Sequence, residues 1–359
     1  MNIYFRHFAV VAFAFGISLA TRADQKTKTL DIYWIDSEGG GSTLIVTPAN
    51  ESVLIDTGNP GGRDSGRIIA AARAAGLTQI DFVLLTHYHV DHFGGAAEVA
   101  AAIPFGSLYQ RSIPEGDPDG RTASNFPLMI KSYREIQTKR EFLAPGLIVP
   151  LRTAKGTPAI ELRCLAADQK FVEPTSMQQQ KKNPLTGSVA PKERDTSDNA
   201  NSAVFLLSFG NFRFFDGGDL SWNLEEKLVT PFNLAGVVDV YQTDHHGMEV
   251  SNNPVLVQSL EPTVVVMNNG PIKGGQAGTF AAIRSTQSVK ALYQVHQSYN
   301  VPAEQNAPPE FLANRGNFTG ADASKCPGNT IKLSVAPDST SYTLSISSNG
   351  HSATYMTKR

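Results

Sequence analysis

Asp81-Phe-Val-Leu-Leu-Thr-His87-Tyr-His89-Val-Asp91-His92-Phe-Gly-Gly95 is the most informative segment of this 359-residue chain. Its first part, Phe82 to Leu85, has the composition of a buried strand. Four potential metal ligands then follow within six residues, and two glycines lead into an alanine-rich helix expected from Ala96 to Ile103. Neutral imidazoles and a carboxylate are donors that zinc prefers. The segment therefore predicts a metal site at the end of a strand.

The spacing of the four ligands predicts two neighbouring ions. On a loop that leaves a strand, His87 and His89 can point to the same side. Asp91 and His92 stand at the start of the following helix and can face a second ion. A single histidine near an apolar face is more often structural, but three histidines and an aspartate packed this closely are typical of a metal centre.

The N-terminus has the pattern of a secretory signal peptide. Arg6 and His7 precede an apolar run from Phe8 to Ala20, and small residues continue to Ala23. This run is too short to span a bilayer comfortably. We therefore expect residues 1–23 to be removed and the mature protein to be exported, periplasmic or secreted, with no stable membrane anchor. A retained N-terminal anchor is the alternative.

Composition is that of an ordinary soluble globular protein, with 41% hydrophobic and 18% charged residues. The formal net charge is −2 and no run of Lys or Arg stands out, so strong nucleic-acid binding is not expected. We expect a small-molecule or short oligomeric substrate; the oligomeric state does not follow from the sequence. The two cysteines, Cys164 and Cys326, could pair in an oxidising compartment or stay free.

Turn signals divide the chain into two halves of similar content. Closely spaced strands at 30–36, 42–46 and 52–55 predict an antiparallel meander, and a helix is expected at 64–75. The segment 104–143 is rich in Pro and Gly and is expected to be irregular, apart from a helix at about 128–142. The second half is expected to contain strands at 147–151, 159–165, 202–207, 212–215, 237–241, 263–267 and 289–295, helices at 225–228 and 280–287, and hairpin strands from 331 onward.

Three further polar motifs follow hydrophobic strands. They are Asp56-Thr-Gly58, Gly218-Asp219 and His245-His246-Gly247. Strand ends are where layered α/β folds present site residues to a common edge. We therefore expect these motifs to join the segment His87–His92 in one site.

The segment His87–His92 matches the HxHxDH signature of the metallo-β-lactamase superfamily. The order of DTG, HxHxDH, GD and HHG resembles the hydrolase domain of ComEC-type competence proteins, over about residues 30–300. The resemblance implies an α+β fold, an αββα sandwich with a strand-rich C-terminal extension. The chain would then divide into a signal peptide at 1–23, a metallo-β-lactamase-like domain at 24–325 and a C-terminal β extension at 326–359 packed on the same domain.

The resemblance also implies two bound ions, Zn²⁺ in the first place with Mn²⁺ as an alternative. His87 and His89 would bind the first ion, Asp91 and His92 would bind the second, and Asp219 would bridge them. Asp56 would orient the ligands from behind them.

The two adjacent histidines would divide the remaining roles. His245 is preferred as the last ligand of the second ion, which leaves His246, together with Asp91, as the catalytic residues. Many superfamily members have one more histidine before the bridging aspartate, but none occurs here between His92 and His245. A water or a loop carboxylate such as Asp198 would fill that position. Weaker candidates for contact with substrate are Tyr88, Asn269, Lys273 and His296.

The implied activity is hydrolysis by a metal-bound hydroxide, because zinc lowers the pKa of a bound water toward neutrality. A phosphoester or phosphodiester substrate is preferred because of the ComEC-like motifs. A lactone, ester or β-lactam substrate is the alternative, and a non-catalytic metal-binding scaffold is the alternative from another class. His89 stands where the iron oxygen-reductases of the superfamily usually have Glu, which favours a hydrolytic metal.

Overall fold

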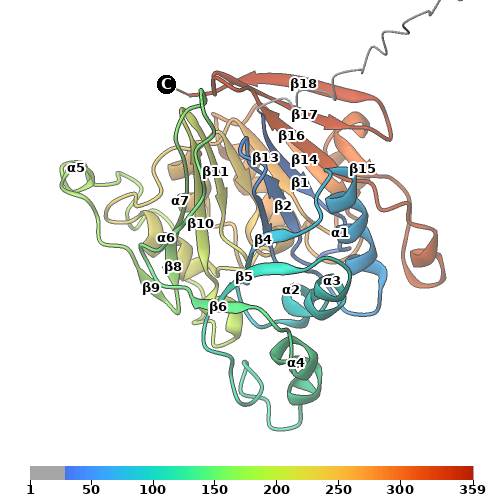
Figure 1. The fold of residues 1–359 in the computed structure, drawn as a ribbon. Coiled ribbons are helices and arrows are strands. Elements are labelled where there is room, and N and C mark those ends of the chain that lie inside the picture. The colour runs from blue at the N-terminus through green and yellow to red at the C-terminus, as the bar shows by residue number, and fades with distance from the viewer. Residues whose placement is uncertain (1–28, 359) are drawn as a thin grey trace, which may run out of the picture.

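The computed structural model describes residues 29–358. The expected signal peptide lies outside the described residues. Two large sheets face each other, with helices on their outer sides (Figure 1). This arrangement confirms the αββα sandwich. No helix in the described part of the chain is both long enough and apolar enough to cross a membrane.

The first sheet has the strand order β18-β17-β16-β1-β2-β3-β4-β5-β6. Strands β1, β2 and β3 form the predicted antiparallel meander, and β3 to β6 are parallel. The carboxyl ends of β3 and β4 therefore meet at one edge. The bounds are β1 (Leu30–Trp34), β2 (Thr43–Val46), β3 (Ser52–Ile55), β4 (Ile80–Leu84), β5 (Phe105–Gln110), β6 (Lys139–Phe142), β16 (Ile331–Val335), β17 (Ser341–Ile346) and β18 (His351–Met356).

The second sheet has the order β15-β14-β13-β12-β11-β10-β8-β7, with β9 paired to β8. Strands β10 and β11 are antiparallel, and β11 to β15 are parallel. Their carboxyl ends lie at a second common edge. The bounds are β7 (Ile148–Val149), β8 (Ile160–Ala167), β9 (Lys170–Phe171), β10 (Val204–Phe209), β11 (Phe212–Asp216), β12 (Val240–Gln242), β13 (Val264–Met267), β14 (Ala291–His296) and β15 (Leu312–Asn314).

Helices cover the two outer faces. Figure 1 shows α1 and α3 on one flank and α6 and α7 on the other. The α-helices are α1 (Arg63–Ala74), α2 (Val90–Phe93), α3 (Ala96–Ala102), α4 (Phe126–Arg134), α5 (Ser176–Gln179), α6 (Trp222–Val229), α7 (Pro254–Leu260) and α8 (Ala277–Ser285). Short 3-10 helices are η1 (Asp198–Asn201), η2 (Asp244–Gly247), η3 (Ala303–Gln305), η4 (Pro309–Phe311) and η5 (Gly320–Lys325).

The alternation of side chains along the strands builds three apolar layers. In β10, Phe205 and Leu207 point into the core between the sheets, whereas Val204 packs against the helices of the second half. In β3, Val53 joins the central core and Leu54 packs with α1 and α3. Because successive side chains of a strand point to opposite faces, strands that are apolar at every position are buried on both sides.

The prediction for residues 104–143 was wrong in two places. Residues 105–110 form β5 inside the first sheet, and the expected helix ends at Arg134, where the chain leaves for β6. Strand β6 lies at the sheet edge, where charged side chains such as Lys139 and Arg140 are common. Arg140 donates to the carbonyl oxygen of Tyr133 at 2.6 Å, which ties the strand to the end of α4. A short charged strand at a sheet edge lacks the apolar alternation of a buried strand, so its sequence was assigned to the preceding helix.

The C-terminal strands extend the first sheet through its N-terminal strand. Asp31 of β1 pairs with Ser334 of β16, and β17 and β18 follow as the expected hairpin strands. The proposed domain boundaries at 24, 325 and 326 stay predictions. Cys164 and Cys326 do not form a disulfide here.

Replacement of Phe214 by alanine tests the core between the sheets. Phe214 is buried, and its ring meets Trp34 edge-on with centroids 5.6 Å apart. The truncation removes buried apolar contacts and leaves a cavity, so the free energy of unfolding should fall by about 3–5 kcal/mol. The control Leu128→Ala, at a side chain 75% exposed, should change it by no more than about 0.5 kcal/mol. Urea unfolding measures both, and equal effects would contradict this description of the core.

Candidate metal centre

The predicted motifs meet where the carboxyl ends of both sheets come together. His87 follows β4, and Asp91 and His92 lie in α2 just after it. Asp219 follows β11 of the second sheet, and His246 lies in η2 directly after β12. The two halves of the sandwich therefore each supply part of one cluster.

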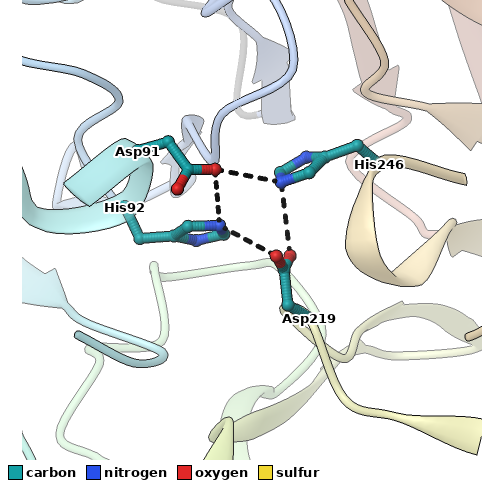
Figure 2. A group of neighbouring side chains, drawn as sticks. All are labelled: Asp91, His92, Asp219 and His246. Atoms are coloured by element: carbon teal, nitrogen blue, oxygen red, sulfur yellow. Dashed lines mark ion pairs between the residues drawn. The ribbon is translucent and has the colours of Figure 1, made fainter. Parts of the chain in front are cut away.

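Four side chains form the tightest group (Figure 2). His92 Nε2 lies 3.3 Å from Asp219 Oδ2 and 3.4 Å from Asp91 Oδ2. His246 Nε2 lies 3.4 Å from Asp91 Oδ2 and 3.4 Å from Asp219 Oδ1. The two rings and the two carboxylates thus enclose a common centre.

A second group lies beside the first and shares Asp219 with it. His87 Nε2 is 3.0 Å from His89 Nδ1 and 3.9 Å from Asp219 Oδ2. Asp219 Oδ1 faces His246, whereas Oδ2 faces His92 and His87. Asp219 therefore has the position of a bridge between the two groups.

The donor set fits metal ions. Two ligands of one tetrahedral zinc ion lie about 3.3 Å apart, since Zn–N and Zn–O distances are about 2.0–2.2 Å. The four-residue group already has this spacing, and the Nε2 atoms of His92 and His246 are buried without a hydrogen-bond partner. Buried polar atoms without partners are costly in free energy unless something binds them.

The backbone at the two adjacent histidines decides which ring enters the group. His245 and His246 have φ of 51° and 55°, in the left-handed region that non-glycine residues rarely adopt. Hydrogen bonds hold this conformation, from His245 N to Gly218 O at 2.9 Å and from Gly275 N to His246 O at 3.0 Å. Strained backbone of this kind clusters at functional sites.

As a result, the positions of the two adjacent histidines are the reverse of those expected from the sequence. His246, expected to be catalytic, joins the four-residue group. His245, expected to be the ligand, stands at the rim, with Nε2 3.5 Å from Asp219 Oδ2 and Nδ1 3.4 Å from Ser251 Oγ.

Asp56 has the position expected of a residue that orients the ligands. Its Oδ2 lies 2.7 Å from His92 Nδ1, and its carboxylate also accepts from the Thr86 amide at 2.8 Å and hydroxyl at 2.7 Å. A β-carbon at Gly41 would lie 2.7 Å from both Asp56 Oδ2 and His92 Nδ1. Only glycine fits this close approach. The hydrogen bond at Nδ1 leaves Nε2 of His92 to face the centre.

Charges in the cluster shift its pKa values strongly. Burial alone would raise the pKa of Asp219, but His246, His92 and His245 hold it well below its usual value. Burial would lower the pKa of His92, but Asp219, Asp56 and Asp91 raise it well above normal. Burial lowers the pKa of His245 to about 4, so this imidazole is neutral at neutral pH.

The loop carboxylate beside the first group is Asp119, which sequence reasoning missed. Asp119 Oδ1 lies 2.9 Å from His89 Nε2 and also accepts from the Asp198 amide at 2.8 Å. Because His89 Nδ1 faces His87, its Nε2 points away from the centre, and Asp119 orients the ring from outside. Asp198, the expected candidate, instead pairs with Arg111 at 2.6 Å. Nothing in the turn that contains Asp119 distinguishes it from an ordinary loop.

The weaker candidates for substrate contact have different environments. The Tyr88 hydroxyl is buried and donates to Arg111 O at 2.6 Å. Asn269 is buried and donates to His296 O at 2.9 Å. His296 is also fully buried and contacts Asp36. Of the four, Lys273 alone reaches the centre, where its Nζ contacts Asp91 Oδ2.

Two grooves reach the centre and share Asp91. The groove that we call the Lys273 groove has a volume of about 630 Å³. The groove that we call the His89 groove has a volume of about 430 Å³. Beside Asp91, the Lys273 groove is lined by Arg63, Lys273 and Phe318, and the His89 groove by His89, Asp119 and Arg121. An extended molecule could therefore approach the centre from either side.

Comparisons with known proteins agree with this geometry. The family model of the metallo-beta-lactamase superfamily matches residues 37–138. Competence protein ComA of Neisseria gonorrhoeae is 24% identical over 265 residues, covering 74% of this chain. This chain spans only 30% of that relative's length.

Solved structures with a similar chain path have low sequence identity. A diphosphatase of the PhnP family is 12% identical with a TM-score of 0.40, covering 79% of this chain and 93% of that one. A putative metal-dependent hydrolase from Parabacteroides distasonis is 13% identical with a TM-score of 0.41, covering 75% and 95%. A mutant metallo-beta-lactamase from Cronobacter sakazakii is 14% identical with a TM-score of 0.35, covering 73% and 76%. Residues 37–138, which contain Asp56 and the segment His87–His92, are therefore similar to the metallo-beta-lactamase superfamily, the family that the sequence predicted.

Proposed function

We propose that this protein is an exported hydrolase that holds two metal ions, zinc in the first place, and cleaves a phosphoester or phosphodiester. The position of Asp219 carries the proposal, because its two carboxylate oxygens face both histidine groups. In this assignment His87, His89 and Asp219 hold one ion. Asp91, His92, His246 and Asp219 hold the other.

The chain's own residues supply orientation, charge and a hydrogen-bond donor. When bound, the ions supply Lewis acidity and an acidified water. Asp56 and Asp119 fix the rings of His92 and His89 from behind. In the tautomer whose Nδ1 accepts from the Ser251 hydroxyl, a neutral His245 carries its proton on Nε2, which faces Asp219. That N–H can donate a hydrogen bond to the negative charge that develops on the oxygen of a leaving group.

Two cations in the Lys273 groove support the preference for an anionic substrate. Lys273 is in contact with Asp91, and its side chain is 39% exposed. Arg63 lines the same groove, where it pairs with Glu38 at 2.7 Å and its side chain is 40% exposed. An ammonium and a guanidinium beside a metal ligand can hold a phosphate oxygen. The name of the relative ComA, a competence protein, is compatible with a phosphodiester but fixes no substrate.

Export and the size of the substrate rest on the sequence. Loss of residues 1–23 would remove Arg6 and Arg22 and make the net charge more negative than −2. An acidic protein does not attract long polyanionic DNA. A small phosphoester or a short oligomer is therefore the proposed substrate.

Asp219→Ala tests the bridge. Both ions lose a shared ligand, so the variant should lose about two ions per chain relative to the parent, and its activity should fall with them. Elemental analysis beside kcat and circular dichroism measures this. Asp338→Ala, at an exposed turn, is the matched carboxylate control and should keep both. An Asp219 variant that keeps its metal and hydrolyses substrate at the normal rate would contradict the bridging role.

His246→Ala and His245→Ala should separate the two histidines. The His246 variant should lose one ion per chain because a ligand is gone. The His245 variant should keep both ions and lose about 10²–10³ in kcat, the usual effect of removing one hydrogen-bond donor to the transition state. Metal stoichiometry measured beside kcat distinguishes them. The reverse pattern would restore the assignment expected from sequence.

A substrate panel tests the proposed bond type. The enzyme should hydrolyse a bis-aryl phosphate faster than an aryl ester, a lactone or a chromogenic β-lactam, because Lys273 and Arg63 favour an anion. The comparison is of kcat/KM at equal metal content. A tenfold preference for the lactone or β-lactam, about 1.4 kcal/mol in transition-state selectivity, would replace the phosphodiester with the alternative. No turnover of any substrate by metal-loaded protein would favour the non-catalytic scaffold.

A further inference from the structure

A second group of possible metal ligands lies outside the centre. Asp36 follows β1, His296 is the last residue of β14 and Cys326 follows η5. One ligand atom from each lies within 4.8 Å of the other two. Asp36 and His296 are fully buried, and Cys326 is partly exposed. We call these three residues the Cys326 cluster.

The atoms of the Cys326 cluster are already close to the spacing of a zinc site. His296 Nε2 lies 2.7 Å from Asp36 Oδ1, and Cys326 Sγ lies 3.3 Å from Asp36 Oδ2. Around one zinc ion, N and O ligands lie about 3.3 Å apart and S and O ligands about 3.6 Å apart. The Nε2–Oδ1 pair would therefore have to open by about 0.6 Å to admit an ion.

The ion pair with Arg67 does not by itself explain why the three side chains of the Cys326 cluster lie together. Its Nη1 lies 3.1 Å from Asp36 Oδ2, but the same guanidinium also pairs with Glu38 at 3.4 Å. On the side of Asp36 that faces His296, Oδ1 accepts from the Glu38 amide at 2.8 Å and from the imidazole at 2.7 Å. A carboxylate only accepts, so a neutral His296 carries its proton on Nε2, and Nδ1 is buried without a hydrogen-bond partner. A cation would take the place of that proton between Nε2 and Asp36.

A reactive thiol is the rival interpretation, and the surroundings of Cys326 disfavour it. Burial and the neighbouring Asp36 carboxylate raise the pKa of the Cys326 thiol to about 12. Nucleophilic and redox-active cysteines need the opposite, a lowered pKa in an electropositive environment. A carboxylate, an imidazole and a thiol brought together from three distant segments are instead a typical set of ligands for a borderline-soft divalent cation.

We propose that Asp36, His296 and Cys326 bind one divalent cation of the zinc class, separate from the two ions of the catalytic centre. Binding forms bonds from the cation to a carboxylate oxygen of Asp36, Nε2 of His296 and Sγ of Cys326. The thiol releases one proton to solvent, and the proton of the neutral imidazole moves from Nε2 to Nδ1. Three protein ligands leave a fourth position for water.

The ion would fix one wall of the Lys273 groove. Phe318, Thr319, Gly320 and Ala323 line that groove, and Cys326 follows them directly in sequence. Coordination would tie this segment to the ends of β1 and β14. The proposal does not depend on the hydrolase assignment, since none of its three ligands belongs to the catalytic centre.

Cobalt(II) titration of the metal-free full-length protein tests the proposal. A cysteine ligand gives a sulfur-to-cobalt charge-transfer absorption in the near ultraviolet, which histidine and carboxylate ligands do not give. The parent protein should show this band at one equivalent per chain. Cys326→Ser should abolish it and lower the metal content by one ion, while the ions bound by Asp219 remain.

Cys164→Ser is the matched control. Cys164 is buried in the central core, where its Sγ contacts the Ala166 carbonyl at 3.3 Å. This variant should keep the band. Asp219→Ala should keep it too, so a wrong assignment of the catalytic centre can be told apart from a wrong third site. His296→Ala should weaken or remove it. A parent protein without the band, or a Cys326→Ser variant that keeps it, would overturn the third site.

Discussion

The burial of the Asp219 carboxylate among histidine rings is the constraint on which the rest of this structure depends. Asp219 is 2% exposed and faces His87, His92 and His246. A buried carboxylate is stable only when cations or donors surround it. Those donors come from both sheets, so the two halves of the sandwich must pack in one register for the carboxylate to be satisfied. The metal centre and the fold therefore impose the same requirement on the chain.

The positions of the motifs could be predicted because they depend on short-range chemistry. HxHxDH, Gly-Asp and His-His-Gly each follow a hydrophobic strand, and parallel strands carry such ends to a common edge. The αββα layers were implied by the family resemblance, and strands whose side chains are apolar on both faces agree with them. Strand β6 was missed because a charged edge strand has no apolar alternation to identify it.

Other features depend on tertiary structure. The choice between His245 and His246 is made by two consecutive residues with positive φ, held by bonds to Gly218 and Gly275. No local pattern indicates such a conformation in non-glycine residues. Asp119 reaches His89 from a turn 30 residues away in sequence, and only the folded chain reveals this contact. The residues that meet at the centre could be predicted, but the direction of each ring could not.

The pairing of β1 with β16 has a consequence for how the chain matures. Asp31 and Ser334 are register partners in the first sheet, so this edge of β1 stays unpaired until the chain has been synthesised as far as β16. Contacts this distant in sequence form slowly, and an open strand edge is a template for pairing with another chain. The newly made protein therefore passes through a stage that is prone to aggregation, during which a chaperone that covers the β1 edge would raise the yield of folded molecules.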